Sequence, residues 1–200
     1  FTTSTLQQEA ARKLGFTVSQ TMMVAQRLYE SGRITYMRTD SVNLSSLAIN
    51  ASKKEIVESY GAEYSNPRKF HTNSKGAQEA HEAIRPTFIN TEDLDWTNQE
   101  RRLYDLIWKR TIASQMADAQ IEKTTVTIDI NGAEEKFVAN GEVVVFDGFL
   151  KVYRESIDEE STSGQDEVHM LPSLRVNDKM ECKEIVSTER FSQGPVRYTE

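Results

Sequence analysis

Gly32-Arg33-Ile34-Thr35-Tyr36-Met37-Arg38-Thr39-Asp40-Ser41 is the stretch on which the interpretation of this 200-residue chain depends. Residues two apart in an extended segment point to the same side, so Tyr36 and Arg38 are expected to face the same way. A phenol has an ordinary pKa of about 10 and attacks phosphorus only when a positive charge and hydrogen-bond donors assist it. Arg38 would supply both. The stretch therefore predicts a candidate tyrosine nucleophile with an arginine beside it.

Helical periodicity dominates the sequence on both sides of this stretch. Apolar residues at helical spacing, hydroxyl residues at the starts and glycines at the ends predict helices over 3–15, 19–31, 45–60 and 98–116. Ser19 is the expected cap of the second helix, and Tyr29 is assigned to its buried stripe. Tyr104 and Trp108 are assigned to the core. With an extended segment over 34–37, the first two helices form a helix-turn-helix followed by a strand, a unit often used against DNA.

The pattern changes to strict alternation after residue 121, which predicts β-structure. Asn131-Gly132 is a hairpin signal, and further strands are expected over 143–146, 149–153 and 179–186. Residues 66–75 are expected to form a loop, 77–84 a short helical turn that stops near Pro86, and 155–167 an acidic, mobile tract. The expected fold class is α+β and multidomain: a mainly helical N-terminal domain with a helix-turn-helix-like unit, followed by an antiparallel β segment.

Composition and charge limit the classes of protein to consider. With 38% hydrophobic and 28% charged residues, the chain has the composition of a soluble globular protein, and it lacks an apolar run of about 18 residues. Cys182 is the only cysteine, which excludes an internal disulfide, and it is expected to be buried. A start at Phe1 without methionine suggests a piece of a longer protein. The net charge of −7 resides in residues 123–200, with 9 basic and 16 acidic residues, whereas residues 1–122 hold 15 of each. A nucleic-acid partner of the first part therefore stays open.

His81 is the second candidate for chemistry. Glu79, His81, Glu82 and Arg85 crowd one short segment, which could hold an imidazolium beside a phosphate. The alternative is a structural histidine on a solvated face. No metal site is expected in the chain itself, because no His-x-x-x-His pair occurs, and no glycine-rich phosphate loop is present.

Three blocks of the sequence carry a resemblance to a known family. They are Phe1-Thr2-Thr3-Ser4-Thr5-Leu6-Gln7-Gln8, the quoted stretch around Tyr36, and Ala80-His81-Glu82-Ala83-Ile84-Arg85-Pro86-Thr87. Together and in this order they resemble signature blocks of the bacterial type IA DNA topoisomerases. The likeness is densest over residues 1–90 and continues more loosely to residues 195–200, which resemble the strand that opens the next domain of that family.

The resemblance implies a mechanism and a role for each candidate residue. Tyr36 matches the tyrosine that attacks a backbone phosphate of single-stranded DNA and forms a 5′-phosphotyrosine, so that strand passage and religation relax negative supercoils without ATP. Arg38 matches the arginine at the scissile phosphate, and His81 matches a phosphate-binding histidine. Asp40 is expected to orient one of them within the DNA-binding site.

The resemblance also implies what surrounds this chain. Residues 1–122 would be the helical domain that bears the catalytic tyrosine, 123–194 an incomplete part of a β-rich arch, and 195–200 the start of the following domain. Mg²⁺ would bind in a domain outside this segment, so the segment alone is expected to be inactive. The expected partner is DNA, with no membrane and no small-molecule substrate, and the expected location is the bacterial cytoplasm at the nucleoid. Two alternatives stay open: a winged-helix DNA-binding module without covalent chemistry, and a protein-interaction domain.

Overall fold

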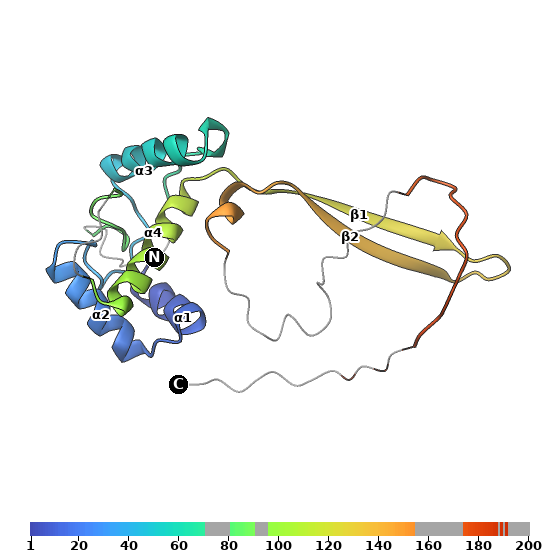
Figure 1. The fold of residues 1–200 in the computed structure, drawn as a ribbon, viewed down its shortest axis with the longest axis horizontal. Coiled ribbons are helices and arrows are strands. Elements are labelled where there is room, and N and C mark those ends of the chain that lie inside the picture. Colours follow the sequence, from blue (N-terminus) through green and yellow to red (C-terminus); the bar gives the residue numbers. More distant parts are fainter. Residues whose placement is uncertain (71–80, 91–95, 155–173, 188, 190, 192–200) are drawn as a thin grey trace. The chain divides into compact units, whose positions relative to one another are not determined.

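The computed structural model describes residues 1–70, 81–90, 96–154, 174–187, 189 and 191. The chain divides into two units, one made of residues 1–120 and 144–156 and the other of 121–143 and 157–200. The regular structure of the described residues comprises four α-helices, two short 3-10 helices and one antiparallel pair of strands (Figure 1), which confirms the α+β class. Among these helices none is long and apolar enough to cross a membrane.

The first two helices begin and end at capping residues. Helix α1 (Thr3–Leu14) starts at Thr2, whose hydroxyl accepts a hydrogen bond from the Thr5 N–H, and ends at Gly15 with a φ of 69°. Helix α2 (Val18–Glu30) starts at Thr17 and not at the expected Ser19, because the Thr17 hydroxyl accepts from the Gln20 N–H. Both helices are confirmed, and the second begins one residue earlier. That they act as a DNA-reading unit remains a prediction.

Helices α3 (Ser46–Ser59) and α4 (Asn98–Ser114) are confirmed as well, and a 3-10 turn η1 (Ala62–Tyr64) follows α3. The aromatic residues of α4 face the interior, as expected. Tyr104 is 8% exposed and its hydroxyl donates to the Phe88 carbonyl at 3.1 Å, and the Trp108 Nε1 donates to the Ile89 carbonyl at 3.0 Å. These two bonds fasten residues 88–89 to α4.

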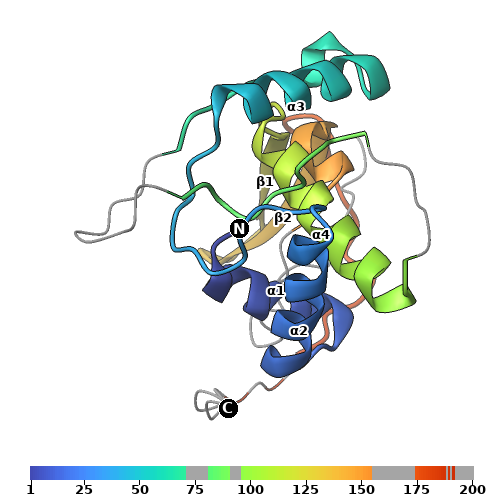
Figure 2. The same ribbon diagram turned by 90° about the vertical axis from the view of Figure 1, so that its left-hand side faces the viewer.

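The core of this unit forms where α1, α2 and α4 pack against one another (Figure 2). Its fully buried side chains include Leu6, Val24, Ile84, Leu103 and Ile107. A smaller cluster joins α3 to the end of α4 through Ile56, Ile112 and Met116. Burial of such side chains is the main source of stability of the helical unit.

Two expectations near the quoted stretch are wrong. Residues 34–37 form no strand; a single bridge joins Ile34 to Pro86, and a proline has no N–H with which to extend the pairing. Residues 81–84 are not helical, because the Ala83 and Ile84 N–H groups donate instead to the carbonyls of Asn43 at 2.8 Å and Phe1 at 2.9 Å. Residues 77–80 lie outside the described part. Residues 66–70 form a loop, as expected.

The hairpin predicted at Asn131-Gly132 is confirmed. Strands β1 (Gln120–Asp129) and β2 (Lys136–Phe146) pair with each other, and Gly132 between them has a φ of 86°. Side-chain pairs that connect the two strands include Lys123–Glu142 at 2.6 Å, Lys136–Asp129 at 2.9 Å and Thr125–Asn140 at 3.0 Å. Most residues of both strands are exposed.

The strand expected over 143–146 is confirmed as the end of β2, but the other two β expectations are wrong. Residues 149–153 contain a 3-10 helix, η2 (Gly148–Lys151), because Gly148 turns the chain at a φ of 50° and the Phe149 N–H donates to the Ala117 carbonyl. Residues 179–186 form no strand, since no described segment pairs with them. Cys182 is exposed and not buried, because that segment packs against no core among the described residues. The acidic tract 155–167 and residues 195–200 lie outside the described part.

Candidate functional site

Tyr36 stands on a short extended segment that the start of α1 holds in place. The Thr3 hydroxyl donates toward the carbonyls of Met37 at 2.9 Å and Thr39 at 3.0 Å and accepts from the Thr39 N–H at 2.9 Å. The Thr3 N–H donates to the Thr39 carbonyl as well. One threonine therefore fixes the backbone directly after Tyr36.

Burial alternates along this segment. The side chains of Met37, Thr39 and Ser41 are buried, whereas Arg38 and Asp40 are exposed and Tyr36 is half-buried. This alternation is what an extended backbone imposes, although the segment is not part of a sheet. Arg38 and Asp40 thus lie on the accessible side of the segment.

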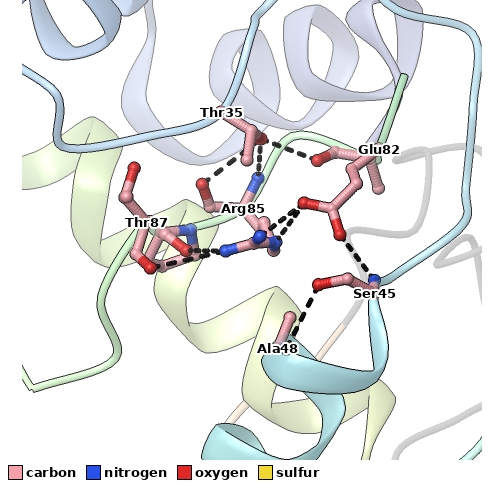
Figure 3. Close-up of polar contacts among 8 residues, drawn as sticks. Thr35, Ser45, Ala48, Glu82, Arg85 and Thr87 are labelled. Carbon is pink, nitrogen blue, oxygen red and sulfur yellow. Dashed lines mark hydrogen bonds and ion pairs between the residues drawn. The ribbon is translucent and has the colours of Figure 1, made fainter. Parts of the chain in front are cut away.

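The backbone directly before Tyr36 is fastened to the segment that carries His81. The Thr35 N–H donates to the Arg85 carbonyl and the Thr87 N–H to the Arg33 carbonyl, both at 2.9 Å. The Thr35 hydroxyl donates to the Ala83 carbonyl at 2.7 Å and accepts from the Arg85 N–H at 3.0 Å. Figure 3 shows Thr35 making these contacts directly above Arg85. The candidate nucleophile and the candidate histidine therefore belong to one hydrogen-bonded frame.

An ion pair between the side chains of Glu82 and Arg85 also belongs to this hydrogen-bonded frame. The Arg85 guanidinium pairs with the Glu82 carboxylate and donates to the Pro86 carbonyl at 2.8 Å (Figure 3). The other oxygen of Glu82 accepts from the N–H of Ser45, the cap residue of α3, at 2.6 Å. Burial raises the pKa of Glu82, but hydrogen bonds from Ser45 and the charge of Arg85 outweigh it and hold the pKa below its usual value. Glu82 is therefore an ionised anchor.

The rings of Tyr36 and His81 meet. Their centroids are 5.6 Å apart, and the Tyr29 ring of α2 contacts Tyr36 from a centroid distance of 5.3 Å with an angle of 66° between the rings. Within the described part of the chain, the polar atoms of Tyr36, Arg38, Asp40 and His81 form no hydrogen bond or ion pair. The donor groups of Tyr36, Arg38 and His81 are therefore available to a ligand with acceptor oxygens, whereas Asp40 can only accept hydrogen bonds.

Three groups of candidates have different outcomes. Tyr36 and His81 are brought into contact, and Arg38 and Asp40 are exposed on the neighbouring positions of the same segment. Arg85 and Glu82 instead bind each other and backbone groups, although the sequence analysis grouped them with His81 as a cluster beside a phosphate. Glu79 lies outside the described residues.

Sequence reasoning missed the supporting residues Thr3, Tyr29 and Thr35. Tyr29 was assigned to the core stripe of α2, but it is 40% exposed and turned toward Tyr36. The one feature of the sequence that could have indicated this contact is that Tyr29 lies at the end of a helix, seven residues before Tyr36. For Thr3 and Thr35 the partners are distant in the sequence, so no local pattern indicates them.

A metal ion is not accommodated by the described side chains, among which no group of three His, Cys, Asp or Glu residues is close enough to hold one. Asp93 and Asp95, an acidic pair two residues apart, lie outside that part. A cavity of about 240 Å³ lies elsewhere in the helical unit, lined in part by Arg68, Arg110 and Phe149, and none of the candidate residues lines it.

Comparisons with known proteins agree on one family. A family model described as DNA topoisomerase matches residues 1–200. The chain is 48% identical to DNA topoisomerase 1 of Zymomonas mobilis and of Synechococcus elongatus, with all of this chain covered and 17% and 23% of theirs. The solved structure of full-length topoisomerase I from Thermotoga maritima matches with a TM-score of 0.64 and 38% identity over 78% of this chain and 27% of that one.

The chain thus spans about a fifth of the length of the curated relatives it matches. The family match over residues 1–200 and the similarity of the fold both agree with the family resemblance that the sequence blocks at residues 1–8, 32–41 and 80–87 carry. This chain belongs to the DNA topoisomerase family, and it corresponds to part of bacterial topoisomerase I.

Proposed function

We propose that this chain carries the nucleophile of a type IA topoisomerase and that Tyr36 is that nucleophile. The observation that carries the proposal is the contact between the Tyr36 and His81 rings, at 5.6 Å, beside an exposed Arg38. A phenol, an imidazole and a guanidinium on one rigid frame match the needs of attack on a phosphodiester: a nucleophile, and cationic donors for the phosphoryl oxygens.

The proposed reaction exchanges one ester for another. The Tyr36 Oη attacks phosphorus in single-stranded DNA, an O–P bond to tyrosine forms, and the bond to the 3′ oxygen breaks. The phenol loses a proton and the departing 3′ oxygen gains one, so the products are a 5′-phosphotyrosine and a free 3′ hydroxyl. The reverse reaction religates the strand without ATP, and passage of a strand between the two steps relaxes negative supercoils.

Arg38, His81 and Asp40 have distinct proposed roles. The planar guanidinium of Arg38 donates two hydrogen bonds to the phosphoryl oxygens as negative charge develops on them. The His81 imidazolium binds a neighbouring phosphate. Asp40 orients one of these two cations. Because Arg85 is already engaged by Glu82 and backbone carbonyls, we assign it no contact with DNA.

The rest of the proposal concerns the whole protein. Residues 1–122 would act as the movable domain that bears the tyrosine, 123–194 as part of the arch, and 195–200 as the start of the following domain. Mg²⁺ would be bound by other parts of the enzyme, so the 200-residue chain would not cleave DNA alone. The whole enzyme would act in the cytoplasm, on DNA of the nucleoid.

The winged-helix alternative has less support. A wing requires a hairpin around residues 33–40, whereas the described residues pair Ile34 with distant Pro86. A surface ion pair between Arg38 and Asp40, which a purely structural role would favour, is absent among the described residues. Covalency is the property that separates the two functions.

The test uses the full-length enzyme with Mg²⁺ and an end-labelled single-stranded oligonucleotide. Tyr36→Phe should abolish the SDS-stable protein–DNA adduct and leave non-covalent binding nearly unchanged, because only the attacking oxygen is removed. Tyr60→Phe, the same substitution at the end of α3, is the matched control and should form adduct normally. An adduct that persists in Tyr36→Phe would overturn the assignment.

A further inference from the structure

The reaction proposed for Tyr36 assigns no role to Tyr29, although the Tyr29 ring contacts the Tyr36 ring. It lies in the last turn of α2, in a stripe expected to be core, and yet 40% of it is exposed. Its ring meets the Tyr36 ring at 5.3 Å in an edge-to-face arrangement, while the His81 ring contacts Tyr36 at 5.6 Å. Among the residues that the structure describes, the Tyr36 ring therefore has two aromatic neighbours, one from α2 and one from the segment 81–87.

The backbone of Tyr36 is immobilised on both sides. Thr35 is hydrogen-bonded to residues 83 and 85, and the residues after Tyr36 are bonded to Thr3. What these bonds leave free is rotation about the side-chain torsions of Tyr36. The phenol oxygen is the atom farthest from the backbone, so a small rotation displaces it more than any other atom of the residue.

Tyr29 is well placed to restrict that rotation, because its own backbone is held firmly. Its carbonyl accepts from the Gly32 N–H at 2.8 Å, and the Arg33 N–H donates to the Leu28 carbonyl at 2.8 Å. Gly32 adopts a φ of 71°, which a glycine tolerates and which turns the chain from α2 toward Tyr36. The end of α2 and the segment that carries Tyr36 are thereby fixed relative to each other.

We propose that Tyr29 is a positioning residue that holds the ring of Tyr36 in the orientation for attack; this rests on the proposed role of Tyr36 as nucleophile. Edge-to-face pairs have a preferred geometry, so the contact limits where the Tyr36 oxygen can point. The hydroxyl of Tyr29 has no hydrogen-bond partner among the described residues. The ring, and not the hydroxyl, is the part that acts.

The experiment compares Tyr29→Ala, Tyr29→Phe and Met23→Ala in the full-length enzyme with Mg²⁺. Met23 is 47% exposed on the same helix and has no ring contact with Tyr36, which makes it the matched control. Single-turnover cleavage of an oligonucleotide gives the rate. The dissociation constant is measured with the same substitutions in a Tyr36→Phe background, where no adduct can form.

Tyr29→Ala should slow cleavage by about tenfold to 100-fold, because a misplacement of about 1 Å at a reacting atom reduces rates on that scale. The dissociation constant should stay within about twofold, since the contact acts on the chemical step. Tyr29→Phe and Met23→Ala should cleave at rates within about threefold of the unmodified enzyme.

Three results would overturn the inference: an unchanged rate in Tyr29→Ala, a rate in Tyr29→Phe as low as in Tyr29→Ala, or an equal loss of rate and affinity. The last would make Tyr29 a DNA contact. Failure of the proposed function looks different, because the unmodified enzyme would form no adduct, or Tyr36→Phe would retain it.

Discussion

The threonine at the start of α1 offers the sharpest test of how the segment that carries Tyr36 is held. The Thr3 hydroxyl accepts one hydrogen bond, from the Thr39 N–H, and has a single proton to share between the carbonyls of Met37 and Thr39. Valine has nearly the same shape but no hydroxyl. Thr3→Val therefore removes one accepted and one donated hydrogen bond without creating a cavity.

The magnitude follows from burial. Each hydrogen bond contributes about 1 kcal/mol net, and an N–H left unpaired costs a further amount of about 1–3 kcal/mol when water cannot reach it. Thr39 is 6% exposed, so its N–H has little access to water. We expect Thr3→Val to lower the free energy of unfolding by about 3 kcal/mol. Thr3→Ser keeps the hydroxyl and loses one methyl group, which should cost about 0.8 kcal/mol.

Urea unfolding followed by tryptophan fluorescence is a suitable assay, because Trp96 and Trp108 are the two tryptophans of the chain and both belong to the helical unit. The signal thus reports on the unit that contains Thr3. The reasoning would be refuted if Thr3→Val and Thr3→Ser destabilised the unit equally. In that case the backbone bond from the Thr3 N–H to the Thr39 carbonyl would suffice to hold the segment.

Two further predictions use the same assay. Gly148→Ala should cost about 2–4 kcal/mol, because the added Cβ would lie 2.6 Å from backbone atoms of Ala117 and Asp118, whereas Gly15→Ala, also at positive φ but with open space around it, should cost about 1 kcal/mol. If both variants lost the same free energy of unfolding, the cost at Gly148 would come from its positive φ alone and not from the close approach of the added Cβ to Ala117 and Asp118. Glu82→Gln should destabilise the unit by about 1 kcal/mol or less at neutral pH, since water screens a carboxylate that is 28% exposed. The folded-state pKa of Glu82 is held below its unfolded value, so its stabilisation is present above the unfolded pKa and is lost as the pH falls through the folded pKa; a pH-independent difference would contradict this.

The helices could be predicted from the sequence because their signals are local. Gly15 ends α1, the hydroxyl of Ser45 caps α3, and the aromatic stripe of α4 packs against the core as its spacing indicates, with Tyr104 buried and Trp108 partly buried. The cap of α2 was misplaced by two residues, since Thr17 and Ser19 are chemically equivalent candidates and only the Gln20 N–H distinguishes them. The hairpin was predictable for the same reason, from Asn131-Gly132 and alternation.

The errors arose where distant residues decide the conformation. A strand was expected over 149–153 because Asp147-Gly148 is a turn signal between two apolar runs, but the packing of Gly148 against Ala117 places a 3-10 helix there. At the candidate site the sequence singled out Tyr36 and His81 as candidates but gave no indication of the hydrogen bonds that hold their segments together. The partners of Thr35 lie about 50 residues away in the chain, and neither periodicity nor composition reports such contacts.

The exposed hairpin has a consequence for anyone who handles this chain. Val143, Val144 and Val145 are consecutive and each is about half exposed, as are Phe137 and Val138 on the same strand. Short apolar β-runs of this kind, whose outer edges pair with no other described strand, favour self-association at high concentration. The excess negative charges of residues 123–200, which hold 16 acidic and 9 basic residues, oppose it. Solubility of the isolated chain should therefore depend on salt, which weakens these charges, more than on the stability of its helical unit.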